Sequence, residues 1–173
     1  MVTCSKEEAA IRQLDEAITM LFANRDPLAI RTLAGAASRV LADLVEKIHP
    51  KCSWREMIVK DSGLTKKGAY AVLDRVQNYL KHADEDPGAY LSFDEEENEH
   101  IIFIATLECG ELEQRLSLSM EVFQLWYVAS YPERFGIDTK LVKTSRSLFP
   151  SLNTFDRRSR LLKAVEKVDQ LRP

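Results

Sequence analysis

Residues 5–22, SKEEAAIRQLDEAITMLF, decide the fold class of this chain. Ser5 and Glu8 form an S-x-x-E pair, in which each side chain accepts a hydrogen bond from the other residue's backbone N–H at the start of a helix. Apolar residues then recur three or four positions apart, as on the buried face of a helix. They are Ile11, Leu14, Ile18, Leu21 and Phe22. The stretch predicts an amphipathic helix that runs to about Asn24.

The following residues carry the same kinds of signal for a second helix. Asp26 stands at an N-cap position and Pro27 at the first helical position, where a missing N–H costs nothing. The sequence HP at His49 and Pro50 ends the pattern. Between these limits lies an apolar stripe at helical spacing, formed by Leu33, Ala37, Val40, Leu41, Leu44, Val45 and Ile48.

Capping residues, periodic apolar positions and helix breakers predict the remaining elements. Helices are expected at 53–61, 65–83, 94–110, 119–131 and 154–171, with a loop and a short helix at 133–153. No alternating apolar and polar run is long enough for a sheet. We therefore expect an all-α protein, a single helical domain over residues 1–173 in which about six or seven mostly antiparallel helices form a bundle.

Composition fits an ordered globular chain in a reducing compartment. Hydrophobic residues make up 45% and charged residues 29% of the sequence. The three cysteines, Cys4, Cys52 and Cys109, lie far apart and are expected to be buried apolar residues. The first residues show no signal peptide, and the apolar runs are shorter than the roughly 20 residues of a membrane span. These features predict a soluble, cytoplasmic protein.

The charge is distributed unevenly along the chain. Residues 84–121 hold twelve acidic residues and one arginine, whereas residues 122–173 hold ten lysines or arginines and five acidic residues. One interpretation places acidic and basic helices side by side or across an oligomer interface; the other is a basic tail that contacts nucleic acid. Basic residues of the last helix are expected on its solvent side: Arg157, Arg158, Arg160, Lys163 and Lys167.

Aromatic residues at helical spacing are expected in the core rather than on a binding surface. They are Trp54, Phe123, Trp126 and Tyr127.

The best candidate site lies on the predicted helix 65–83. At 100° per residue, Arg75, Asn78 and His82 fall within about 60° of one another. The apolar residues of this helix, expected to be buried, centre roughly 100° away. They are Ala69, Val72, Leu73, Val76, Leu80 and Ala83. The polar trio is suited to hold a phosphate or carboxylate, with His82 as a proton carrier. The alternative is that Asn78 and His82 make structural hydrogen bonds, while Arg75 pairs with an acid of the following helix.

Motifs for cofactor chemistry are missing. The sequence contains no GxGxxG, GxxxxGK[ST], HExxH or GxSxG, and no zinc-ligand spacing, so no cofactor is assigned. The acids after His82 suggest two metal hypotheses. One is a calcium loop that begins at Asp84 and has Asp86 at its third position; the other is a transition-metal site that combines His82 and Asp84 with Glu97 and His100. Neither is adopted. The calcium loop has Gly88 and Ala89 at its fifth and sixth positions and is restrained by Pro87, and the transition-metal site needs the turn to fold back onto the following helix.

Two resemblances to known families involve this helix. The spacing from Arg75 to His82 is similar to the Arg, four to six residues, His pattern of HEPN domains, although Val76 departs from that family's usual polar residue. This resemblance implies a compact, often dimeric helical domain with metal-independent ribonuclease activity. The stretches NYLKHADEDP and DPLAIRTLAGAASRVLADL, residues 78–87 and 26–44, resemble an uncharacterised group of small bacterial helical proteins. Such relatives carry a histidine where this chain has Arg31.

Three functions follow as expectations. The first is a non-catalytic interaction module that self-associates as a homodimer. The second is an RNA-acting protein in which Arg75 stabilises a phosphate, His82 performs acid-base chemistry and Asn78 orients it. The third is a metal-dependent hydrolase built around His82 and the neighbouring acids.

Overall fold

A computed structural model describes residues 1–82, 84, 87–136 and 139–172. Within these residues the chain forms nine α-helices, two short 3-10 helices and no strand, which confirms the all-α prediction. The helix count exceeds the expected six or seven for two reasons. The predicted helix 65–83 is broken in two, and the short helix expected within 133–153 is present, with nine residues, in addition to the longer ones.

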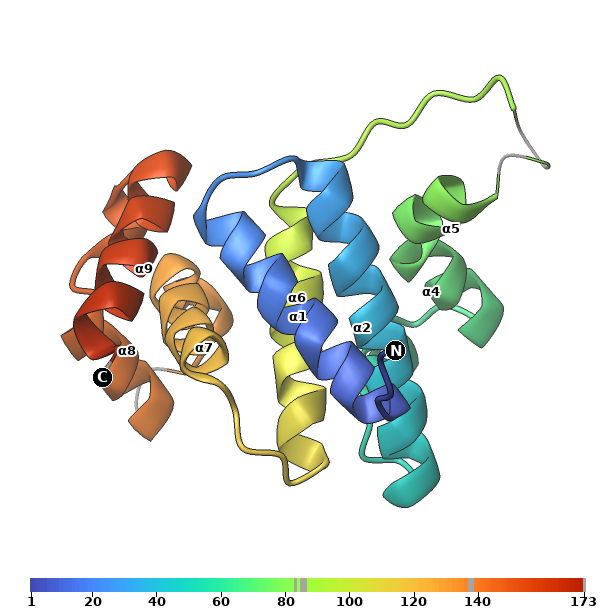
Figure 1. The fold of residues 1–173 in the computed structure, drawn as a ribbon, viewed down its shortest axis with the longest axis horizontal. Coiled ribbons are helices and arrows are strands. Elements are labelled where there is room, and N and C mark those ends of the chain that lie inside the picture. Colours follow the sequence, from blue (N-terminus) through green and yellow to red (C-terminus); the bar gives the residue numbers. More distant parts are fainter. Residues whose placement is uncertain (83, 85–86, 137–138, 173) are drawn as a thin grey trace.

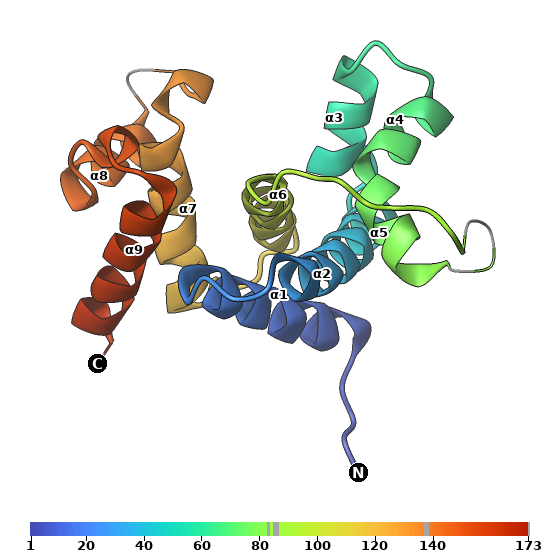
Figure 2. The ribbon, with the colours of Figure 1, turned by 90° about the horizontal axis from the view of Figure 1, so that it is seen from above.

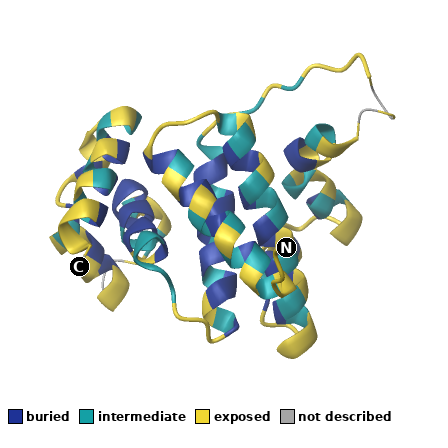
Figure 3. Cartoon of the chain, viewed as in Figure 1, coloured by how far each residue is buried: buried dark blue, intermediate teal, exposed yellow. Residues whose placement is uncertain are grey.

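Three helices form the centre of the molecule (Figure 1). They are α1 (Lys6–Phe22), α2 (Pro27–Ile48) and α6 (Glu97–Glu111), which we call the body. The predicted caps are present: the Ser5 hydroxyl accepts a hydrogen bond from the Glu8 N–H, and the Asp26 carboxylate accepts from two N–H groups of α2. The buried stripe of α1 faces the other helices of the body, so the core runs through the centre of the molecule (Figure 3).

A second group of helices lies on one side of the body. It consists of α7 (Leu118–Ser130), η1 (Pro132–Arg134), α8 (Lys140–Leu148), η2 (Leu152–Thr154) and α9 (Arg157–Leu171). Phe123, Trp126 and Tyr127 of α7 are buried, as predicted, and the indole N–H of Trp126 donates to the Arg160 carbonyl at 2.8 Å. This bond joins α7 to α9.

The third group lies on the opposite side of the body (Figure 2). It consists of α3 (Trp54–Asp61), α4 (Lys66–Leu73) and α5 (Arg75–Lys81), which we call the arm. From the arm, the segment 87–96 returns to α6 as an extended connection without a helix (Figure 1).

The prediction of one continuous helix over 65–83 is wrong because the chain breaks at Asp74. The carboxylate of Asp74 forms an ion pair with the buried guanidinium of Arg55 and a second one, at 3.7 Å, with Arg39. Asp74 leaves regular helical geometry at this point and is both the C-cap of α4 and the N-cap of α5. Val72 was expected to be buried and instead is 65% exposed. Ala83 lies outside the described residues.

Other apolar residues also lie outside the core, contrary to expectation. Ile48 and Trp54 are exposed, and of the three cysteines only Cys109 is buried, whereas Cys4 and Cys52 are exposed. Ile48 ends α2 three residues after Val45, the last residue of this helix in the buried core, so the helical pattern continues past the core. In the described part of the chain, we find no helix with the combination of length and apolar character that crossing a bilayer requires.

Candidate functional site

The three predicted site residues lie on or next to α5 and line one open cavity of about 260 Å³. Arg75 is the first residue of α5, Asn78 lies one turn later and His82 is the C-cap. Other lining residues come from α5 and from the connection to α6: Tyr79, Ala89, Tyr90 and Leu91. The Tyr79 hydroxyl donates to the Ala89 carbonyl at 2.9 Å and so holds the connection against α5.

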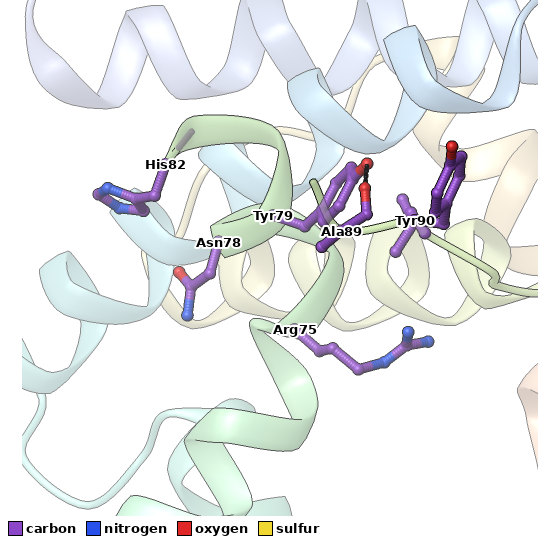
Figure 4. Close-up of a pocket in the computed structure, with 7 residues that line it drawn as sticks. Arg75, Asn78, Tyr79, His82, Ala89 and Tyr90 are labelled. Carbon is purple, nitrogen blue, oxygen red and sulfur yellow. Dashed lines mark hydrogen bonds between the residues drawn. The ribbon is translucent and has the colours of Figure 1, made fainter. Parts of the chain in front are cut away.

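The three side chains do not converge within this cavity (Figure 4). The imidazole of His82 and the amide of Asn78 point to one side of α5, whereas the guanidinium of Arg75 extends to the other. Arg75 donates to the Ser92 carbonyl at 3.0 Å and lies 3.5 Å from the Glu97 carboxylate of α6. The expected alternative, in which Arg75 pairs with an acid of the following helix, is therefore present.

The same alternative expected Asn78 and His82 to make structural hydrogen bonds, but both side chains are exposed. Their side chains make no hydrogen bond to any residue that the structure describes, so they do not act as structural links. An exposed imidazole and an amide on one side of a helix can bind a polar ligand. A guanidinium already neutralised by Glu97 adds little charge to that binding.

The residues proposed for metal binding are not assembled. His100 of α6 lies in a different environment from His82, because its Nδ1 is 2.9 Å from the Tyr127 hydroxyl. Asp84 is exposed, and Asp86 lies outside the described residues. Across residues 1–82, 84, 87–136 and 139–172, no three His, Cys, Asp or Glu side chains are placed to hold a metal ion.

A polar seam between α2, the arm and the start of α6 was not predicted. Arg31 of α2 is 3% exposed, donates to the Leu73 carbonyl at 3.2 Å and lies 4.0 Å from Glu97. Burial lowers the pKa of Arg31, and the Glu97 carboxylate opposes this shift. Several buried polar atoms of these elements have no hydrogen-bond partner among the described residues: Arg31 Nη1, Arg55 Nε, and Nε2 and Oε1 of Gln77.

A second unpredicted network joins α6 to α7 and α9. The carboxylate of Glu99 is fully buried, accepts a hydrogen bond from the Tyr131 hydroxyl at 2.7 Å and lies 2.8 Å from Arg157 Nε. One turn away, Arg160 pairs with Glu96 at 3.1 Å. Burial raises the pKa of the Glu99 carboxyl, while the Tyr131 hydroxyl and the charge of Arg157 act to lower it.

This network shows that, contrary to expectation, the basic residues of the last helix do not all face solvent. It also bears on the interpretation that acidic and basic helices lie side by side. Arg160 is buried and Arg157 half-buried, so both face α6 rather than solvent. Acidic α6 and basic α9 are therefore joined by ion pairs within one chain, as the first interpretation stated. A possible signal was the shared spacing: the two arginines and the two glutamates are each three residues apart, on one face of their helices.

The chain was also compared with known proteins. No protein-family model, no curated protein and no solved structure matches it. The assignment of a function therefore depends on the geometry described above.

Proposed function

We propose that this protein is a non-catalytic interaction module that associates with a second copy of itself through the arm. The observation that supports the proposal is the group of large apolar side chains that the arm leaves in solvent. Trp54 and Ile58 lie one turn apart on α3, Leu64 follows α3, and Val72 lies near the end of α4.

The sequence pattern supports the interpretation of these exposed residues as an interface. Val72 belongs to an apolar helical face of the kind that is normally buried, and the folded chain does not cover it. Four exposed apolar side chains in a segment that also carries Lys60, Lys66 and Lys67 have the composition of an interface with an apolar centre and a polar rim. A second copy of the chain that covers this surface would bury the apolar side chains that the sequence pattern predicts to be buried.

Charge favours contact between the arm of one copy and the acidic connection of the other. Residues 54–81 hold six lysines or arginines and three acids, whereas the connection 87–96 holds three acids and no lysine or arginine. Two arms that met face to face would repel each other. A two-fold arrangement in which each arm contacts the partner's acidic residues gives two equal attractive contacts.

The mass of the protein in solution tests this proposal. Light scattering after size-exclusion chromatography should give twice the chain mass of 19.8 kDa. A Val72→Asp variant should shift the protein to the monomer, since it places a charge in the apolar centre of the interface. Leu162→Asp is the matched control, because Leu162 is 55% exposed on α9, away from the arm. A monomeric parent protein, or a Val72→Asp variant that stays as dimeric as the parent, contradicts the proposal.

One observation favours a second candidate function, a HEPN-like action on RNA without a metal. Arg75, Asn78 and His82 line the same open cavity, with Tyr79 and Tyr90 as aromatic neighbours on which a base can stack. In this proposal His82 transfers the proton, Asn78 orients it and Arg75 leaves Glu97 to bind the phosphate.

Incubation of the protein with single-stranded RNA in the presence of a chelator tests the second candidate. The parent should shorten the RNA, and His82→Ala should abolish cleavage while binding remains. His49→Ala, which removes an exposed histidine outside the arm, should cleave like the parent. RNA that stays intact with the parent rules the activity out.

A further inference from the structure

A second cavity, of about 430 Å³, lies where α7, α8 and η2 meet, on the side of the body opposite the arm. Its volume is in the range of small-molecule sites. Apolar walls come from Ala129, Pro132, Phe149 and Pro150, and polar groups from Arg146, Ser151 and Asn153. Such a mixture of apolar walls and a few polar side chains is typical of a site for an organic ligand.

The guanidinium of Arg146 has no ion-pair or hydrogen-bond partner among the residues that the structure describes, and it is the one charged side chain that those residues contribute to the cavity's lining. Arg146 is exposed and lies in the last turn of α8, so its side chain borders the cavity without being fixed by the protein. A guanidinium binds a carboxylate through two parallel hydrogen bonds. The cavity therefore offers a positive group to a ligand.

The backbone beside Arg146 is unusual. Ser151 has a φ angle of 55° and occupies the left-handed region, which residues other than glycine rarely adopt and which is found at ligand-binding turns. Ser151 and Asn153 both line the cavity. A serine hydroxyl and an amide can each hydrogen-bond to a carboxylate oxygen.

The sign and size of the local charge favour a monoanion. Arg146 contributes a single positive charge, and α8 ends at Leu148, so its C-terminal carbonyl groups bring partial negative charge close to the cavity. A phosphate dianion would be repelled by those carbonyl groups more strongly than a carboxylate. The apolar walls add affinity for a hydrocarbon or aromatic body.

We propose that this cavity binds a small organic carboxylate, with Arg146 holding the carboxylate group and the apolar walls holding the rest of the molecule. The site is separate from the arm and from the cavity at His82, so this proposal does not depend on either proposed function.

Titration of ¹⁵N-labelled protein with phenylacetate, monitored by NMR, tests the proposal. Phenylacetate should shift the amide signals of residues 146–149 and 151–153, whereas phenylacetamide, which has the same shape without the charge, should bind about tenfold more weakly. Arg146→Gln should weaken phenylacetate binding by about tenfold and leave phenylacetamide binding unchanged, while Arg146→Lys should lie between.

Arg158→Gln is the matched control, because it removes an exposed arginine from α9 that does not line the cavity. It should bind phenylacetate like the parent. Three results would each overturn the proposal: no shift of the cavity's signals, equal binding of acid and amide, or equal binding by Arg146→Gln and the parent. Because Arg146 is exposed, its replacement should leave the fold intact, which the remaining NMR signals report.

Discussion

Gln77 of α5 lies against Gly35 of α2 so closely that a β-carbon at position 35 would stand 2.3 Å from the Gln77 side-chain oxygen. A glycine inside a helix costs about 0.5–1 kcal/mol relative to alanine, and here the absent side chain makes room for Gln77. This close approach fixes the distance between the arm and the body.

Replacement of Gly35 by alanine should therefore lower the free energy of unfolding by about 1 kcal/mol, since the buried Gln77 must move. In a Gln77→Ala background the same change should raise stability by about 0.5 kcal/mol, because only the helix preference of alanine remains. A double-mutant cycle measured by urea unfolding gives both values. Equal effects of Gly35→Ala in the two backgrounds would show that the contact does not matter.

Asp74 is expected to be essential for the attachment of the arm. Asp74→Ala leaves the guanidinium of Arg55, which is 3% exposed, without its carboxylate, and a buried charge that loses its partner costs about 3 kcal/mol. Hydrogen exchange should show the largest loss of protection in α4 and α5.

Asp43→Ala is the matched control for that measurement. Asp43 also pairs with an arginine, Arg39, but at an exposed position where ion pairs contribute little. The two variants should therefore differ strongly in their urea midpoints. Similar midpoints would contradict the expectation that the ion pairs of Asp74 hold the arm to the body.

Stability should fall in mildly acidic solution because of His100. Burial lowers the pKa of His100 below its usual value of about 6.5, and the positive charge of Arg134 lowers it further. The carboxylates that oppose this shift are Glu96, Asp94 and Glu97. The unfolded chain then binds a proton that the folded chain does not, so this contribution is complete above about pH 6.5 and is lost as the pH falls towards the lower folded pKa.

Urea midpoints measured from pH 8 to pH 5 check this expectation. His100→Gln should show a smaller loss of stability over this interval than the parent, whereas His49→Gln, at an exposed position, should follow the parent. The comparison uses the slopes with pH, because His100→Gln also removes the contact with Tyr127. Parallel slopes for all three proteins would refute the assignment.

The cysteines should react at very different rates. Burial raises the pKa of the Cys109 thiol to about 12, and the negative charges of Asp15, Glu7 and Glu108 add to the effect. Cys4 and Cys52 are exposed. An aromatic disulfide reagent should therefore modify two thiols of the folded protein quickly and the third only in denaturant. Rapid reaction of Cys109 in the folded protein would contradict its burial.

Helix positions could be predicted from local signals, because these act within a few residues. The caps at Ser5 and Asp26 and the apolar spacing of α1 place the first two helices close to their observed limits. Gly110 was a less reliable signal: α6 continues through it to Glu111, and Glu113, with a φ of 56°, adopts the left-handed conformation instead.

Features that depend on distant residues could not be predicted. The break at Asp74 requires Arg55, and the burial of Arg160 requires Glu96, 64 residues away in the sequence. The candidate trio shows the same limit. Arg75, Asn78 and His82, which helical spacing grouped together, line one cavity, but Arg75 pairs with Glu97 and its side chain points away from His82.

The route of the chain through the arm has a consequence for how the protein can change. Helix α2 packs directly on α6, although the whole arm lies between them in the sequence. The arm is thus an excursion that leaves the body and returns to it. Evolution can lengthen, shorten or exchange such an excursion without altering the central three helices, and so can acquire new partners on an unchanged frame.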